Sequence, residues 1–118
     1  MGRKTSSRQR LQDIIDAIDR IRTYTADADL HVFTATPMLY DAVIRNIEVI
    51  SEATRHIPES AKAEHPQTPW RAIADIGNVL RYAYDRIDDH IVWSTVQNDL
   101  EPLRAAVEAM IGSEEKRP

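Results

Sequence analysis

The stretch "PMLYDAVIRNIEVISEATRHI", residues 37–57, decides the fold. Its apolar residues recur at steps of three and four and cover more than one face, which is typical of a helix packed on several sides. Pro37 suits the first position of a helix, because its missing N–H has no helical partner there, and Thr36 is the expected N-cap. The sequence therefore predicts a central helix from Met38 to Ile57.

The segments on either side of this helix differ in their patterns. Residues 7–25 carry apolar side chains at helical spacing with aspartates and arginines between them, which predicts an amphipathic helix. Residues 26–37 lack that period and are expected to be irregular. Residues 58–69 hold three prolines, and proline disfavours helical backbone in the residue before it. We expect a loop there with one helical turn.

A third main helix is expected after this loop. Thr68 is its predicted N-cap, and Pro69 is its predicted first residue. Apolar residues keep helical spacing from Trp70 to about Tyr84.

A fourth, long helix is expected near the end of the chain, with Asp88 or Asp89 as its N-cap. Pro102 removes a backbone hydrogen bond, so a kink is predicted near it. Gly112 is expected to end the helix, and residues 113–118 are expected to form a disordered tail.

Composition limits the class of protein. The 118 residues suit one domain, over residues 1–112, and four main helices with short connections predict an all-α antiparallel bundle. A net charge of −4 argues against binding nucleic acid by bulk charge alone. The chain has no cysteine, and its four histidines are too scattered to predict a metal site. Neither a signal peptide nor a membrane span is indicated, so a cytoplasmic protein is expected.

Polar residues interrupt the apolar central helix at Arg45, Asn46, Glu48 and Glu52. Arg45 and a glutamate one or two turns later stand near one another on a helix. Two interpretations are open. The residues form a polar network that fixes how helices pack, or they line an active cleft or an interface.

The stretch "GNVLRYAYDRIDDH", residues 77–90, holds the most unusual residues. A glycine inside a helix costs about 1 kcal/mol relative to alanine, so Gly77 indicates either a close helix contact or the loss of a larger, once useful side chain. Tyr82 and Tyr84 point in different directions on a helix, so at most one can belong to the core.

Four stretches together resemble the HepT-like ribonucleases of the HEPN superfamily: "RLQDIIDAIDRIRTYT", "DAVIRNIEVISEATRHIPE", "HPQTPWRAIADIGNVL" and "VWSTVQNDLEPL". The resemblance implies the toxin half of a bacterial toxin–antitoxin pair. Such a toxin forms a homodimer with its motifs in a cleft between subunits, and it cuts RNA without a metal or cofactor. The implied partner is a minimal nucleotidyltransferase antitoxin, which can transfer adenylate to the motif tyrosine.

The family motif is arginine, four residues, histidine, one residue and tyrosine. In this sequence Gly77 stands at the arginine position, Tyr82 at the histidine position and Tyr84 at the tyrosine position. These three are the expected catalytic positions, and the resemblance makes Tyr84 the candidate for modification. Because neutral tyrosine is a poor general base and glycine carries no charge, nuclease activity is expected to be weak or lost.

Residues beside the motif complete the expected site. Asn78 matches the family, and Arg81 and Arg86 are the nearby cations expected to contact RNA. Arg81 directly precedes Tyr82 and is expected to face another direction.

Two functions remain in competition. One is a toxin with residual ribonuclease activity, and the other is a non-catalytic helical dimer that binds a nucleotidyltransferase partner. For either, the dimer is expected to use apolar residues such as Val49, Val92 and Trp93.

Overall fold

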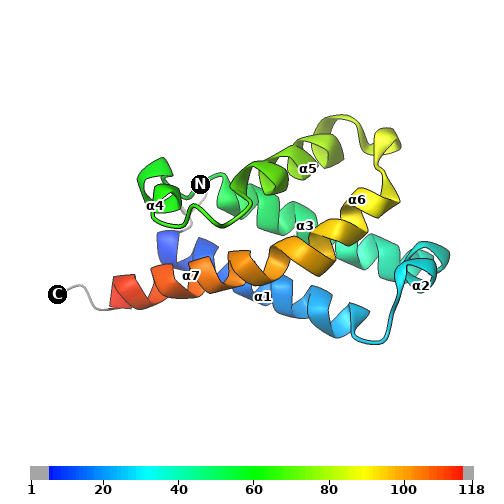
Figure 1. The fold of residues 1–118 in the computed structure, drawn as a ribbon, viewed down its shortest axis with the longest axis horizontal. Helices are drawn as coiled ribbons and strands as arrows, with labels where there is room; N and C mark the ends of the chain where they lie inside the picture. Colours follow the sequence, from blue (N-terminus) through cyan, green and yellow to red (C-terminus); the bar gives the residue numbers. More distant parts are fainter. Residues whose placement is uncertain (1–5, 116–118) are drawn as a thin grey trace, which may run out of the picture.

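The computed structural model describes residues 6–115, and this part of the chain is helical and without strands (Figure 1). The all-α prediction is confirmed. In chain order the elements are α1 (Ser7–Thr25), α2 (Leu30–Ala35), α3 (Pro37–Thr54), α4 (Glu59–Ala63), α5 (Trp70–Tyr82), a 3₁₀ turn (Tyr84–Arg86), α6 (Asp89–Ser94), a π-helical turn (Thr95–Asp99) and α7 (Leu100–Glu115).

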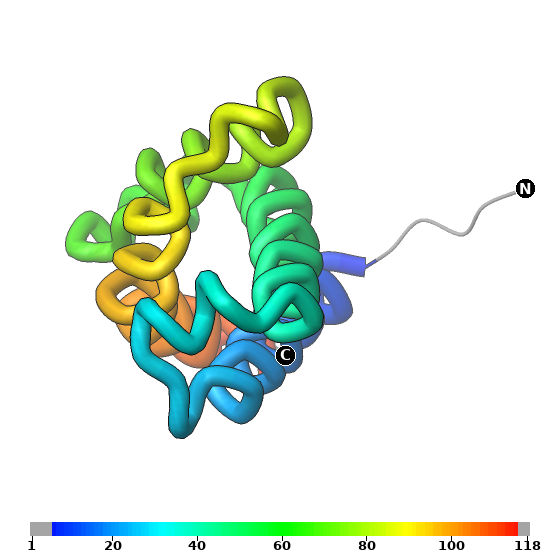
Figure 2. The backbone as a smooth tube through the Cα atoms, turned by 90° about the vertical axis from the view of Figure 1, so that its right-hand side faces the viewer, coloured from blue at the N-terminus to red at the C-terminus, as the bar shows by residue number. Residues whose placement is uncertain are grey.

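The long helices pack around one apolar core. Helix α1 packs against both α3 and α7, and α3 packs against α5, while α2 closes one end of the bundle on α3 and α6 (Figures 1 and 2). The core draws on all of these helices, because the amphipathic stripes of the sequence converge there. Its most deeply buried large side chains are Phe33, Ile14, Ile18, Ile21, Ile47, Ile50, Ile73, Leu103, Val43, Val92 and Val107.

Helix α1 and helix α3 begin as the sequence indicates. The Ser6 hydroxyl accepts a hydrogen bond from the Gln9 amide at 3.1 Å and caps α1. Pro37 opens α3, although the preceding Thr36 makes no capping bond with its side chain. Helix α3 ends at Thr54, earlier than the predicted Ile57.

Helix α2 was missed in the sequence analysis. The Asp29 carboxylate accepts a hydrogen bond from the Val32 amide at 2.8 Å and caps it. Its one buried residue is Phe33, whose ring lies 5.1 Å from the rings of both Tyr40 and Trp93. A six-residue helix with one buried side chain shows no period, which explains the miss.

The loop before α5 contains the predicted helical turn, α4, but the predicted cap is wrong. Pro69 occupies the N-cap position of α5, and Thr68 is buried with no hydrogen-bond partner for its hydroxyl in the described part of the chain. The indole N–H of Trp70 instead fixes the loop, because it donates to the carbonyls of Lys62 and His65 at 3.2 and 3.1 Å. Helix α5 ends at Tyr82, and Tyr84 lies in the following 3₁₀ turn.

The distortion predicted near Pro102 takes the form of the π-helical turn over Thr95–Asp99. Proline offers no N–H to the carbonyl four residues earlier, Asn98, and its ring crowds that oxygen, so a wider turn relieves both problems. Before it, the Asp88 carboxylate accepts a hydrogen bond from the His90 amide at 2.8 Å, which confirms Asp88 as the cap.

Two expectations for the end of the chain are wrong within the described residues. Helix α7 passes through Gly112, whose φ is not positive, and continues to Glu115. Residues 113–115 are therefore helical, and residues 116–118 of the expected tail lie outside the described residues.

The apolar residues expected at a dimer surface belong largely to the interior of this chain. Val92 is completely buried, and Trp93 packs on Phe33. Val49 is half-buried against the core. No helix of residues 6–115 has the length and apolar character needed to cross a bilayer.

Candidate functional site

A cleft between α3 and α5 contains the first motif position. Its volume is about 370 Å³, and we call it the Gly77 cleft. The residues that line it are Arg45, Glu48, Ser51, Glu52, Gly77, Leu80 and Arg81. Helices α3 and α5 lie side by side (Figure 1). Charged residues that lie about thirty positions apart in the chain therefore line one cleft.

Gly77 touches α3 at Ser51. A Cβ atom at position 77 would lie 1.7 Å from the Ser51 hydroxyl oxygen and 2.6 Å from its Cβ. The hydroxyl can rotate away, but the Cβ is fixed to the α3 backbone. Of the two interpretations of this glycine, the close helix contact is therefore the one that the structure supports. An arginine at position 77 does not fit while Ser51 stays in place.

Arg81 lines the same cleft as Gly77, because residues four apart share one face of a helix. Its Nη2 donates to Glu52 Oε1 at 2.7 Å. The same carboxylate also lies 3.2 Å from both Arg55 and His56. The hydrogen bond from His56, followed by the charges of Arg55 and Arg81, lowers the pKa of Glu52. Glu52 is thus an ionised acceptor shared by several donors.

The polar residues of α3 divide between two faces. Arg45 and Glu52 line the Gly77 cleft, whereas Asn46 is buried toward α1. Asn46 Oδ1 accepts from Arg20 Nε at 2.8 Å, and its amide nitrogen donates to the carbonyl of Ala42 at 2.8 Å. Asn46 therefore fixes helix packing and does not line the Gly77 cleft. An active role for Arg45 and Glu52, which do line it, stays a prediction.

The two tyrosines of the motif lie outside the Gly77 cleft and the core. Tyr82 is 78% exposed, and the guanidinium carbon of Arg81 lies 5.7 Å from its ring centroid. Tyr84 is 54% exposed in the 3₁₀ turn. The structure thus separates the expected catalytic positions: Gly77 is buried against α3, and both phenols are accessible at the end of α5.

The sequence analysis missed Tyr40, which lies in the first turns of α3 and near this end of α5. The pKa of Tyr40 is raised to about 12, mainly by burial and then by the neighbouring Asp89 carboxylate. Tyr84 makes a smaller contribution. Its contact with Phe33 depends on the unpredicted helix α2. No local pattern in the sequence marks such a contact.

Arg86 lies in another groove, between α5 and the segment 86–99, which includes α6 and the π-helical turn. This groove has a volume of about 430 Å³, and its lining includes Val79 and Asp99. Burial raises the pKa of Asp99. Asn78 is exposed on α5 and lines neither cleft. The three residues expected to contact RNA, Asn78, Arg81 and Arg86, therefore do not converge on one point.

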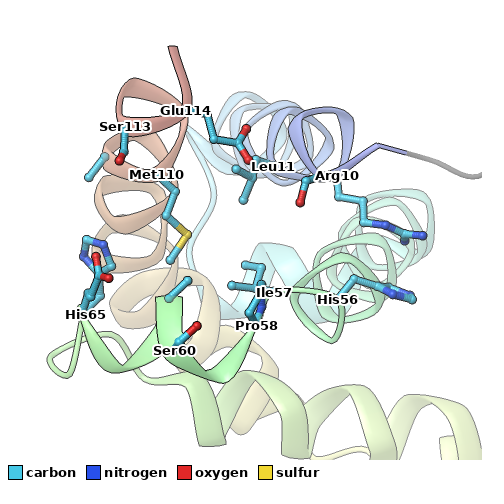
Figure 3. A pocket seen from close by; sticks show the side chains of 14 residues that line it. Arg10, Leu11, His56, Ile57, Pro58, Ser60, His65, Met110, Ser113 and Glu114 are labelled. Carbon is cyan, nitrogen blue, oxygen red and sulfur yellow. The ribbon is translucent and has the colours of Figure 1, made fainter. Parts of the chain in front are cut away.

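A third cavity lies where α4 meets the start of α1 and the end of α7. Its volume is about 450 Å³, and Figure 3 shows Met110 pointing into it while Arg10 and His56 point away. It contains none of the motif positions. Within residues 6–115 no group of three histidine, cysteine, aspartate or glutamate side chains is arranged to hold a metal ion.

Known proteins similar to this chain are ribonucleases by name. The family described as "Ribonuclease HepT-like" matches residues 14–110. "Probable ribonuclease HepT" of Thermococcus cleftensis is 35% identical over 107 residues, which cover 91% of this chain and 97% of that protein. "Putative RNase MJ1380" of Methanocaldococcus jannaschii is 32% identical over 98 residues, which cover 83% and 90% of the two chains. No solved structure gives a significant match. The extent of these matches shows that the chain belongs to the HepT-like ribonuclease family.

Proposed function

We propose that this protein is the toxin component of a toxin–antitoxin pair whose metal-independent RNA endonuclease activity is weakened or lost. Family membership and the names of the relatives support a ribonuclease ancestry. The observation that carries the loss of activity is the contact between Gly77 and Ser51. At the motif position where the family has a phosphate-binding arginine, this chain has Gly77, which packs against Ser51 of α3.

The chemistry of RNA cleavage explains the expected size of the defect. A histidine near neutral pKa exchanges protons with the ribose hydroxyl and the leaving oxygen, and an arginine stabilises the growing phosphate charge. Tyr82 stands at the histidine position and is exposed to solvent, and a neutral phenol is a poor general base. Loss of the acid–base group and of the cation each costs about 100-fold or more in rate.

The test is cleavage of a fluorescently labelled single-stranded RNA by the purified protein, with a chelator present. We expect cleavage near background. A triple variant, Ser51→Gly with Gly77→Arg and Tyr82→His, restores both motif groups and removes the clash, so its cleavage rate should rise by at least about 100-fold. Ser51→Gly alone is the matched control and should remain inactive. Rapid cleavage by the unaltered protein would refute the proposed loss.

A second candidate function is a non-catalytic, cytoplasmic homodimer that binds a minimal nucleotidyltransferase. The exposed phenols of Tyr82 and Tyr84 favour it, because an enzyme that transfers adenylate needs an accessible acceptor. Mass spectrometry after co-expression with a minimal nucleotidyltransferase should show one adenylate on Tyr84. Tyr84→Phe should abolish it, and Tyr82→Phe is the matched control. A protein that stays unmodified and monomeric in light scattering would refute this function.

A further inference from the structure

We propose that Arg45 and Arg81 together form a phosphodiester-binding site in the Gly77 cleft, in place of the cation missing from position 77. This inference rests on the proposed RNA-directed function. It names Arg45 and Arg81 as the residues that hold the RNA backbone, and Glu52 as the residue that restrains Arg81.

Position in the fold supports the pairing of these two arginines. Arg81 lies one turn after Gly77 on the same face of α5, and Arg45 reaches the same cleft from α3. The cleft has a volume of about 370 Å³ and is open to solvent. A phosphate that enters the cleft therefore meets guanidinium groups from two helices, and guanidinium is the side chain best suited to bidentate phosphate contacts.

The charges of the cleft also leave one cation available to an anion. Arg45 has no ion-pair partner among residues 6–115, so its charge is available to a ligand. Among the residues that line the cleft, the charges of Arg45 and Arg81 balance those of Glu48 and Glu52, whereas the whole chain carries −4. The cleft is thus locally more positive than the rest of the protein.

Glu52 restrains the second cation. Its carboxylate holds Arg81 at 2.7 Å, so a phosphate must compete with it for this guanidinium. The pKa of Glu52 is lowered, and the group stays charged at neutral pH. Arg55 and His56 provide the carboxylate with other donors when Arg81 turns toward a ligand, because both already lie 3.2 Å from it. RNA binding therefore exchanges one partner of Arg81 for another.

The experiment measures binding of a labelled single-stranded RNA by fluorescence anisotropy at several salt concentrations. We expect Arg45→Ala to weaken binding about five-fold and to lower the salt slope by about 0.7, the value for one phosphate contact on a single strand. Arg71→Ala is the matched control, because Arg71 is 93% exposed on α5 and outside the cleft; it should leave binding nearly unchanged.

A second pair of variants tests the role of Glu52. Glu52→Gln should strengthen binding about five-fold, since it removes a negative charge and frees Arg81. Glu48→Gln removes the same charge from the same cleft without freeing an arginine, so its gain should be smaller. Adding Arg81→Ala to Glu52→Gln should cancel the gain.

The outcomes separate this inference from the proposed function. If the unaltered protein binds RNA but Arg45→Ala binds equally well, the site is wrong and the proposed function stands. Equal gains from Glu52→Gln and Glu48→Gln would show that bulk charge, and not the release of Arg81, controls affinity, which also overturns the site. Absence of any RNA binding by the protein would overturn both.

Discussion

Replacing Gly77 with alanine tests the contact on which the reading of the motif depends. The added Cβ would lie 2.6 Å from the Ser51 Cβ, so α3 and α5 must separate by roughly 1 Å to reach ordinary contact. Overpacking of this kind costs about 1–3 kcal/mol, and the upper part of that range applies because both atoms are fixed to helix backbones. The better helix propensity of alanine returns about 1 kcal/mol. The free energy of unfolding should therefore fall by about 1–2 kcal/mol.

Urea denaturation followed by circular dichroism measures this change. Gly112→Ala is the matched control, because it makes the same substitution inside a helix where no atom lies within 4 Å of the new Cβ. It should raise stability by about 0.5 kcal/mol. Ser51→Gly should partly rescue Gly77→Ala in a double-mutant cycle, because it removes both colliding atoms. If Gly77→Ala is instead as stable as Gly112→Ala, Ser51 yields without cost and the argument that arginine is excluded fails.

Three further predictions concern other contacts. Arg104 on α7 donates two hydrogen bonds, of 2.9 and 3.0 Å, to the carboxylate of Asp19 on α1. These hydrogen bonds are the main reason why the pKa of Asp19 is lowered. Asp19→Asn should therefore cost about 1 kcal/mol at pH 7, a value limited by solvent screening. Because the folded pKa lies below the ordinary 3.8, this difference should shrink as pH falls below that value, and Asp16→Asn serves as the control in acid denaturation. Asn46→Ala should lower the free energy of unfolding, measured in urea, by about 1–2 kcal/mol, because it leaves Arg20 without its acceptor. Arg45→Ala, at the adjacent exposed position, is the control and should change the free energy of unfolding by less than about 0.5 kcal/mol. Tyr40→Phe should remove a phenolate absorbance step near pH 12 from an alkaline titration. It should also lessen the loss of stability between pH ~10 and 12, because a pKa that is raised in the folded state stabilises the fold at low pH and this contribution is lost as pH rises to the folded value.

The helices with long apolar stripes were predictable, because a period of 3.6 residues is visible in the chain itself. Helices α1 and α3 begin at or within one residue of the expected places, and Asp88 caps α6 as expected. Local rules failed where tertiary contacts decide. Helix α2 is stabilised by the contacts of Phe33 with Tyr40 on α3 and Trp93 on α6. Helix α7 continues through Gly112, because this glycine does not adopt the positive φ of a helix C-cap.

The site was predictable only in part, for the same reason. The resemblance marked position 77, but the meaning of its glycine depends on Ser51, which lies 26 residues earlier in the sequence. Arg81 was expected to point away from the motif because it was compared with Tyr82. Compared with Gly77 it lies on the same face, and a helical wheel drawn from Gly77 would have shown this.

The proposed site would bind RNA without cleaving it. Cations that reach the cleft from Arg45 and Arg81 can hold a phosphate, but guanidinium stays protonated at all physiological pH values and cannot act as a base. Proton transfer still requires an acid–base group such as the family's histidine, and this chain has a tyrosine at that position, Tyr82. The two cations of the proposed site would therefore replace only the missing arginine and not the missing histidine. Because the two losses have different physical causes, a histidine at position 82 should raise the cleavage rate without changing affinity, whereas Arg45→Ala should change affinity in any background.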